Sequence, residues 1–107
     1  GTDVLVNDDT TNDRDDPSVA VGVGEGCMGN VYVVWQDQRN SNYDVYGARS
    51  IDGGEVFEAN RLISDSLAGD QMNPSIAVDS ACVVGVAWRD DVVNESWDIR
   101  AAILPSW

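Results

Sequence analysis

The 107-residue chain contains two copies of one sequence unit. The segment DPSVAV at residues 16–21 recurs as NPSIAV at residues 73–78, an offset of 57 residues. Further along, VVWQD at residues 33–37 matches VAWRD at residues 86–90 at an offset of 53 residues. A repeat of this kind indicates one supersecondary unit used twice, with the changes in spacing taken up by loops. We therefore expect a single domain over residues 1–107 that contains two repeats.

Each copy has the sequence pattern of short β-strands rather than of helices. Val, Ile, Tyr and Trp recur in short runs that are bounded by Gly, Pro, Asn and Asp. Gly-rich or polar stretches between the runs supply the turns, so each copy is expected to form an antiparallel meander. The pattern predicts strands at residues 18–23, 31–37, 44–50 and 61–64 of the first copy, and at residues 75–78, 83–90 and 97–104 of the second.

One stretch of the first copy resembles a known structural motif. Residues 50–57, SIDGGEVF, fit the Asp-box pattern Ser-x-Asp-x-Gly-x-x-Trp/Phe and follow a predicted strand. Together with WQDQR at residues 35–39 and DVY at residues 44–46, the unit resembles the repeats of sialidase-like (BNR, Asp-box) β-propeller proteins. The resemblance covers both copies and implies a structural turn rather than an active site. It assigns that turn to Ser50, Asp52, Gly53, Gly54 and Phe57.

The resemblance implies an all-β fold of two four-stranded antiparallel propeller-type blades. Repeat 1 spans about residues 15–65 and repeat 2 about residues 72–107, but the second repeat contains only three of the four strands and no Asp-box. Residues 3–7 match residues 60–64, the last strand of the first repeat. The strand order is therefore the permuted D-A-B-C-D-A-B-C, completed by strand exchange or oligomerisation. The fourth strand of the second blade is expected to come from the same or another chain, through Asp3, Val4, Leu5, Val6 and Asn7.

The charge composition excludes several classes of function. The chain has 19 acidic residues, 6 arginines, no lysine and no histidine, which gives a net charge of −13. This charge repels nucleic acid and anionic membrane surfaces, and the longest apolar runs are too short to cross a membrane. The lack of histidine removes Ser-His-Asp and Cys-His catalysis. We therefore expect no enzyme, no cofactor, no nucleic-acid partner and no membrane insertion.

The arginines and tyrosines do not restore a catalytic site. In sialidase-like enzymes the arginine, tyrosine and carboxylate set is distributed over about six blades, which two blades cannot assemble. Arg39 is two residues from Asp37 and close to Asp44, so an ion pair within the repeat is favoured over substrate binding. Alternation along residues 31–35 assigns Tyr32 to ordinary sheet packing.

Two cysteines and one glycosylation triplet bear on the compartment. Cys27 and Cys82 lie outside any CxxC pattern and have no histidine with which to share a metal, which leaves a disulfide or two buried free thiols. A disulfide would join the loops that precede the second strand of each repeat. The triplet that begins at Asn94 is an acceptor pattern for N-glycosylation. Both features favour a secreted protein or one on the extracellular surface.

The densest acidic segment is the loop at residues 7–16. Alternating oxygen ligands in a loop can hold calcium, and the candidate ligands are Asp8, Asp9, Asp13 and Asp15. The loop lacks the glycine and the closing glutamate of an EF-hand, and the corresponding loop of the second repeat has only two acidic residues. A solvated acidic loop is the favoured interpretation, with calcium as the alternative.

Two blades cannot close a propeller, which needs about four to eight. The expected function is that of a non-catalytic secreted structural subunit, which assembles with copies of itself by β-strand complementation into a ring or an extracellular filament. A second hypothesis is a sugar-binding, lectin-like two-blade module that trimerises, with Trp97 and Trp107 stacking on glycans. A third is a fragment of a larger sialidase-like enzyme or adhesin.

Overall fold

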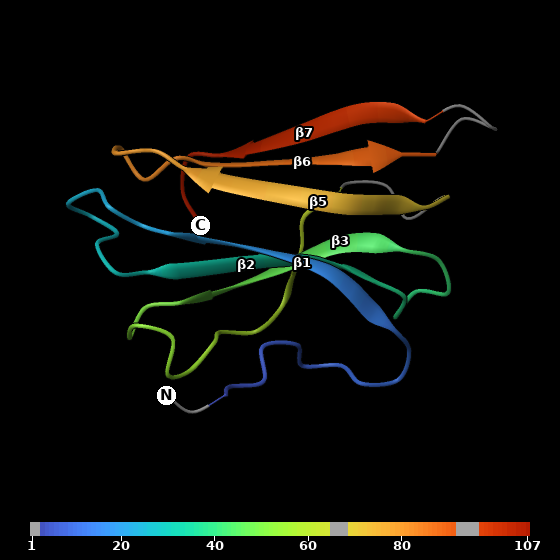
Figure 1. The fold of residues 1–107 in the computed structure, drawn as a ribbon, viewed down its shortest axis with the longest axis horizontal. Coiled ribbons are helices and arrows are strands. Elements are labelled where there is room, and N and C mark those ends of the chain that lie inside the picture. The colour runs from blue at the N-terminus through green and yellow to red at the C-terminus, as the bar shows by residue number, and fades with distance from the viewer. Residues whose placement is uncertain (1–2, 65–68, 92–96) are drawn as a thin grey trace.

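Two antiparallel β-sheets make up the protein (Figure 1). The structure is a computed structural model that describes residues 3–64, 69–91 and 97–107. The all-β prediction is confirmed, because these residues form no helix, and no candidate membrane-spanning helix is found among them. The first sheet consists of β1 (Arg14–Val21), β2 (Val31–Asp37), β3 (Asp44–Ser50) and β4 (Arg61–Leu62), and the second of β5 (Gln71–Val78), β6 (Val84–Asp90) and β7 (Asp98–Leu104).

The two sheets carry the same backbone irregularity at the same repeat position. The pairing of β1 with β2 shifts register within residues 15–18, and the pairing of β5 with β6 shifts within residues 72–75. Inside these bulges Asp16 has a φ of 53° and Asn73 a φ of 56°, a left-handed conformation that Asp and Asn tolerate better than most residues. Because pairing resumes beyond each bulge, β1 and β5 begin earlier than the sequence predicts. The sequence repeat is therefore a structural repeat.

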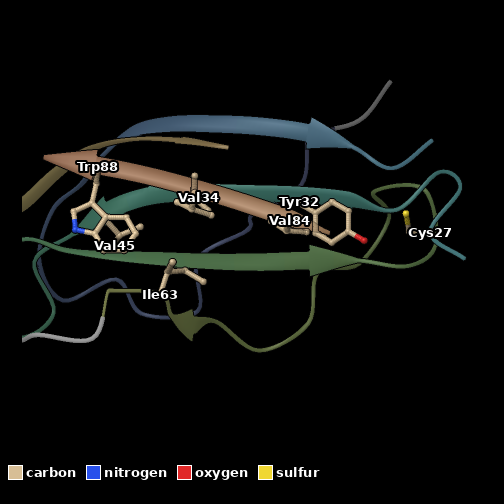
Figure 2. Close-up of a cluster of buried hydrophobic side chains, with 8 residues drawn as sticks. Cys27, Tyr32, Val34, Val45, Ile63, Val84 and Trp88 are labelled. Atoms are coloured by element: carbon tan, nitrogen blue, oxygen red, sulfur yellow. The ribbon is translucent and has the colours of Figure 1, made fainter. Parts of the chain in front are cut away.

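A buried hydrophobic cluster joins the facing surfaces of the two sheets (Figure 2). Alternation along β2 and β6 points every second side chain of each strand toward the other sheet. Removal of this apolar surface from water, at about 25 cal/mol per Å², is the main contribution that holds the sheets together. The buried members of the cluster are Cys27, Tyr32, Val34, Val45, Ile63, Val84, Val86 and Trp88.

The opposite face of the first sheet carries a second, smaller cluster, which we call the Trp35 cluster. Its buried members are Trp35 of β2 and Tyr46 and Ala48 of β3. Val6 and Phe57, which come from segments outside the sheet, pack against it. In Figure 1 the N-terminal segment runs along this side of the first sheet, away from the second sheet. The first sheet is thus packed on both faces, whereas the second sheet is packed on one.

The N-terminal segment, residues 3–7, differs from the prediction. It forms no β-strand and does not extend the second sheet, which has three strands in the part of the chain that the structure describes. It lies on the outer side of the first sheet instead, where Val6 packs against the Trp35 cluster. Only residues 8–13 connect it to β1, a tether of at most about 20 Å. Because the first sheet lies between the segment and β7 (Figure 1), the chain does not complete its own second sheet.

Candidate functional site

Hydrogen bonds to Asn60 hold the N-terminal segment against the first repeat. The backbone N–H of Asp8 donates to Asn60 Oδ1 at 2.7 Å, and the backbone N–H of Asn60 donates to Asp8 Oδ2 at 2.9 Å. Asn60 Nδ2 also donates to the carbonyl oxygen of Val6 at 3.0 Å. These bonds fix the backbone at residues 6–8 beside the residue that precedes β4. The segment therefore has a defined position on the sheet.

Arg39 links the same segment to the turn between β2 and β3. Its guanidinium pairs with Asp37 at 2.8 Å and with Asp8 at 2.9 Å, and it donates to Asn60 Oδ1 at 2.9 Å. It also lies over the ring of Tyr46, 4.1 Å from the centroid. The predicted ion pair between Arg39 and Asp37 is confirmed. Its additional contacts make Arg39 the side chain through which the core of the first sheet orders the N-terminal segment.

Two buried carboxylates face each other beside Arg39. Asp37 and Asp44 are paired residues of the β2–β3 ladder, and both are fully buried. Burial alone would raise the pKa of Asp37, but hydrogen bonds from Arg39 and from the indole N–H of Trp35 outweigh it and hold this pKa below its usual value. Burial raises the pKa of Asp44, against the opposing hydrogen bond from Asn40. One carboxylate is therefore held charged and the other is biased toward its neutral form.

The N-terminal segment has the same relation to the first sheet that residues 61–64 have to the second. Val6 and Ile63 are 57 positions apart, and Trp35 and Trp88 are 53 apart, so each pair occupies equivalent positions of the repeat. Val6 packs against the Trp35 cluster, and Ile63 packs in the buried cluster that contains Trp88. Because β4 pairs with β3 as the fourth strand of the first sheet, residues 3–7 lie where the fourth strand of a preceding sheet would lie.

The edge of β7 is the matching position without a fourth strand. In the first sheet Tyr46 pairs with Leu62, and the N–H of Ile63 donates to the carbonyl oxygen of Val45 at 2.8 Å. The corresponding residues 99–101 of β7 pair with β6, and over the described ranges no strand pairs with their other side. An open strand edge presents a row of backbone donors and acceptors to another chain.

The turn at residues 50–57 is held by side chains that bond to its own backbone. Asp52 Oδ1 accepts the N–H groups of residues 55 and 56, both at 3.0 Å, and it accepts the hydroxyl of Ser50 at 2.7 Å. Ser50 Oγ in turn accepts the N–H of Gly54 at 2.9 Å. The hydrogen bonds from residue 56 and from Ser50 hold the pKa of Asp52 below its usual value. The site is a backbone clamp rather than a ligand site.

The remaining residues assigned to this turn also have structural roles. Gly53 and Gly54 have φ values of 77° and 95°, the left-handed region in which a side chain is disfavoured. Phe57 leaves the turn and packs against the Trp35 cluster. The turn therefore anchors the stretch between β3 and β4 on the same side of the sheet as the N-terminal segment.

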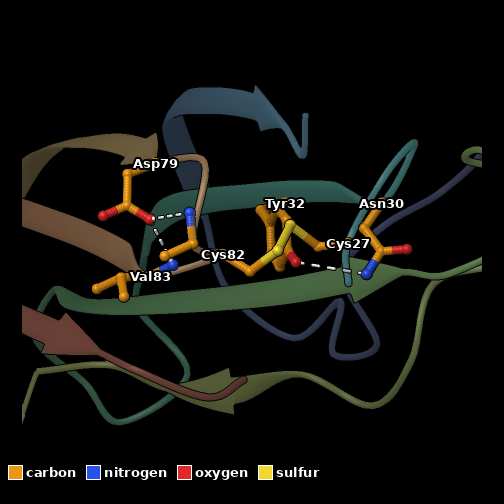
Figure 3. Close-up of a disulfide and its surroundings, with 7 residues drawn as sticks. Cys27, Asn30, Tyr32, Asp79, Cys82 and Val83 are labelled. Carbon is orange, nitrogen blue, oxygen red and sulfur yellow. Dashed lines mark hydrogen bonds between the residues drawn. A yellow bond between two sulfur atoms is a disulfide. The ribbon is translucent and has the colours of Figure 1, made fainter. Parts of the chain in front are cut away.

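Cys27 and Cys82 form a disulfide bond between the two repeats (Figure 3). The bond joins the β1–β2 loop to the β5–β6 loop, as the sequence predicts, across 55 residues. Asp79 Oδ1 accepts two backbone N–H groups of the β5–β6 loop, both at 2.9 Å, and so shapes that loop. A Cβ at Gly24 would lie 2.3 Å from the carbonyl oxygen of Ser80, so a glycine is needed where the two loops meet.

The acidic loop makes contacts within the protein. Asp8 is bonded to Asn60 and Arg39, and Asp9 Oδ1 accepts the N–H and the hydroxyl of Thr11 at 2.8 and 2.6 Å. No group of three or more metal-ligating side chains converges anywhere in the described ranges. The four candidate residues, Asp8, Asp9, Asp13 and Asp15, thus do not converge as a group of three or more side chains, and calcium binding stays the alternative prediction.

Trp107 is partly buried and packs against the first sheet. Its ring meets that of Tyr32 edge-on with centroids 5.5 Å apart, and the guanidinium of Arg61 lies 5.5 Å from its centroid. A Cβ at Gly47 would lie only 2.7 Å from the indole, so this glycine makes room for it. These contacts favour a packing role for Trp107, and its stacking on a glycan stays a prediction.

Trp97 and Asn94 are the other two residues that the sequence connects with carbohydrate. Trp97 is 43% exposed, and the guanidinium of Arg89 lies 4.4 Å from its ring centroid. One face of the indole is therefore already occupied by a cation. Asn94 lies outside the described residues.

Sequence reasoning missed Asn60, and it considered Asp8 only as part of a solvated acidic loop or, alternatively, as a calcium ligand. The hydrogen bonds between them join residues that are 52 positions apart, and the match of residues 3–7 to residues 60–64 indicates equivalent positions in a repeat rather than a contact. No family model, curated protein or solved structure matches the chain. The functional interpretation therefore depends on the geometry of the two sheets and the N-terminal segment.

Proposed function

We propose that the protein is a non-catalytic, secreted structural subunit that assembles with copies of itself by β-strand complementation. Residues 3–7 of one copy add to the open edge of β7 of a preceding copy. The observation that carries the proposal is the position of the segment, since Val6 lies against the Trp35 cluster as Ile63 lies beside Trp88. This position supports the proposal that the segment serves as the fourth strand of a sheet in another copy.

The repeat predicts the register of this pairing. Tyr46 is opposite Leu62 in the first sheet. Asp44-Val45 matches Asp98-Ile99 at an offset of 54 residues, so Tyr46 corresponds to Arg100, while Leu62 corresponds to Leu5 at an offset of 57. The repeat therefore places Leu5 opposite Arg100. The N–H of Val6 would then donate to the carbonyl oxygen of Ile99, as Ile63 donates to Val45 within the chain. The pairing would satisfy backbone groups of β7 and cover an edge that is prone to uncontrolled association.

Two further observations support this proposal. The disulfide between Cys27 and Cys82 is typical of an oxidising compartment. The proposed contact between copies is heterologous, because residues 3–7 of one copy meet β7 of another, and these are different surfaces of the chain. Copies joined in this way form a ring if the rotation closes and a filament if it does not. The sialidase-like propeller resemblance favours the ring, and the same pairing serves both.

A cysteine pair tests the proposed register. Leu5→Cys and Arg100→Cys in one chain should form disulfides between copies, giving a ladder of covalent multimers on a non-reducing gel, because opposed residues have Cβ atoms about 5 Å apart. The matched control is Leu5→Cys with Ile99→Cys, since Ile99 points to the other face of β7. Equal ladders from both pairs, or unchanged assembly after deletion of residues 1–8, would show that strand exchange does not join the copies.

A further inference from the structure

We infer that the outer face of the second sheet docks against the first sheet of another copy of this chain. The inference rests on the proposed function, and it adds the surface on which each added copy sits. Val84, Val86 and Trp88 point inward to the buried cluster, so their neighbours in β6 point outward. The outer face consists of the side chains on that side of β5, β6 and β7: Ser75, Ala77, Gly85, Ala87, Arg89, Ile99, Ala101 and Ile103.

The composition of the outer face is unlike that of the rest of the chain. Ile99 is 78% exposed and Ile103 is 66% exposed, on a sheet face whose other members are small. The chain has 19 acidic residues, but this face has none and carries a single arginine. It is therefore a surface at which two strongly acidic copies can approach with the least charge repulsion. Exposed apolar patches of this kind mark sites of association.

The repeat shows which surface covers this face. Ile99 corresponds to Val45 and Ala87 to Val34, at the repeat offsets of 54 and 53 residues. Val45 and Val34 are fully buried, because the second sheet packs on them. The outer face is thus the repeat counterpart of a face that a following sheet covers within the chain. The following sheet for the outer face is the first sheet of the next copy.

The complementary surface is uncovered at the other end of the molecule. Val19 and Val21 of β1 are 61% and 52% exposed on the Trp35 side of the first sheet. Their counterparts Ile76 and Val78 pack against the buried cluster between the sheets. Beside them, a hollow of about 300 Å³ is lined by residues 4–7 together with Pro17, Val33 and Trp35. Each copy therefore carries both halves of the intersheet contact, one at each end.

The contact between the two sheets within the chain includes a polar link. Gln36 Oε1 accepts the backbone N–H of Asn73 at 2.9 Å. The repeat counterparts of these residues are Arg89 and Asp16. Their side chains already have partners within the chain, since Arg89 Nε donates to Asn73 Oδ1 and Asp16 Oδ2 accepts from Asn73 Nδ2, both at 2.8 Å, so the contact between copies rests on its apolar residues. The copies stack head-to-tail. The outer face of one copy covers the Trp35 side of its neighbour, and residues 3–7 of that neighbour pair with the edge of β7.

Two substitutions at opposite ends test the head-to-tail contact. Ile103→Asp places a charge on the outer face, and Val19→Asp places one on the Trp35 side. Both residues are exposed, so the folded monomer is retained, which circular dichroism and thermal unfolding verify. Met28→Asp, in a loop where the side chain is 68% exposed, is the matched control. Sedimentation velocity of the purified full chain should show each end variant monomeric at concentrations at which wild type and control assemble.

Mixing the two end variants gives the decisive result. Each retains the half that the other lacks, so an equimolar mixture should form a 1:1 dimer and nothing larger. If Val19→Asp alone forms dimers while Ile103→Asp stays monomeric, the outer faces pair with themselves; in that case, or if the mixture stays monomeric, the head-to-tail assignment is wrong. If both variants assemble normally while deletion of residues 3–7 prevents assembly, the docking face is wrong and strand donation stands. If the deletion has no effect either, the proposed function fails as well.

Discussion

Trp35 and Trp88 occupy the same position in the two repeats but have different neighbours. Trp88 is buried in the cluster between the sheets, whereas Trp35 packs against Val6 and Phe57 and donates its indole N–H to Asp37 at 2.9 Å. Two short segments thus cover Trp35 where a whole sheet covers Trp88. The Trp35 side is therefore the face of the first sheet that the second sheet does not cover.

Loss of the Arg39 guanidinium should destabilise the first sheet. Arg39→Met leaves the buried carboxylate of Asp37 without its cation and should lower the free energy of unfolding by about 3 kcal/mol. Arg39→Lys keeps the charge but loses the fork that also reaches Asp8 and Asn60, so it should give a smaller loss. Urea denaturation measures both. Equal midpoints for Arg39→Met and wild type would contradict this account of the ion pair.

Asp52 should contribute to stability and not to association. Asp52→Ala removes the acceptor of two backbone N–H groups in the turn, so the melting temperature should fall. Glu55→Ala is the control in the same turn, because Glu55 contributes its backbone N–H to the clamp. Differential scanning calorimetry compares the two. A change in assembly by Asp52→Ala at unchanged melting temperature would show that the turn acts in recognition instead.

Asp44 should make stability decrease as the pH rises. Burial raises its pKa above that of the unfolded chain, so the folded protein holds a proton that the unfolded chain releases. This contribution is complete below the unfolded pKa of about 3.9 and is lost as the pH rises through the folded pKa. Asp44→Asn removes the titration, so the variant should gain stability relative to wild type as the pH rises from below the unfolded pKa through the folded one. A stability difference that does not change with pH would refute this assignment.

The disulfide should stabilise the monomer substantially. Closing a loop across 55 residues restricts the unfolded chain by about 4 kcal/mol in the loop-entropy model. Cys27→Ala with Cys82→Ala should lower the free energy of unfolding by that order, as should reduction of the wild type. Chemical denaturation with and without reductant measures the effect, with the double variant as the control for reductant alone. Two free thiols in native material by mass spectrometry would contradict the bond.

The strands show how far the sequence predicts the fold. β2 and β3 have the predicted bounds, because their apolar runs are closed by polar and Gly-rich turns at both ends. β1 and β5 extend further, since the Asp-Pro and Asn-Pro bulges shift the register without ending the pairing. Residues 3–7 show the limit. Their match to residues 60–64 predicts a strand, but a strand forms only beside the open edge of a sheet. Residues 3–7 pair with no described strand of either sheet.

The covering of the Trp35 side was less predictable than the strands. The hydrogen bonds of Asn60 and the multiple contacts of Arg39 depend on segments brought together by folding, and no local pattern marks them. Spacing alone indicated the partner of Arg39 in Asp37, two residues away. Contacts between residues close in the sequence can thus be predicted from it, whereas contacts between residues about 50 positions apart can be identified only in the folded structure.

Salt should promote assembly. Every added copy brings a net charge of −13, and the repulsion between copies is screened over about 10 Å at 0.1 M salt and about 3 Å at 1 M. The apolar outer face does not lose its attraction under these conditions, so the assembled fraction should rise with NaCl concentration in sedimentation velocity.

CaCl₂ at matched ionic strength is the control. Because the described acidic residues form no metal site, calcium should act by screening alone, to the extent expected of a divalent ion at that ionic strength. MgCl₂ gives the reference for such screening. Assembly that requires calcium and is absent in MgCl₂ would show that the loop at residues 7–16 binds the metal, and would make ion binding rather than screening the control on association.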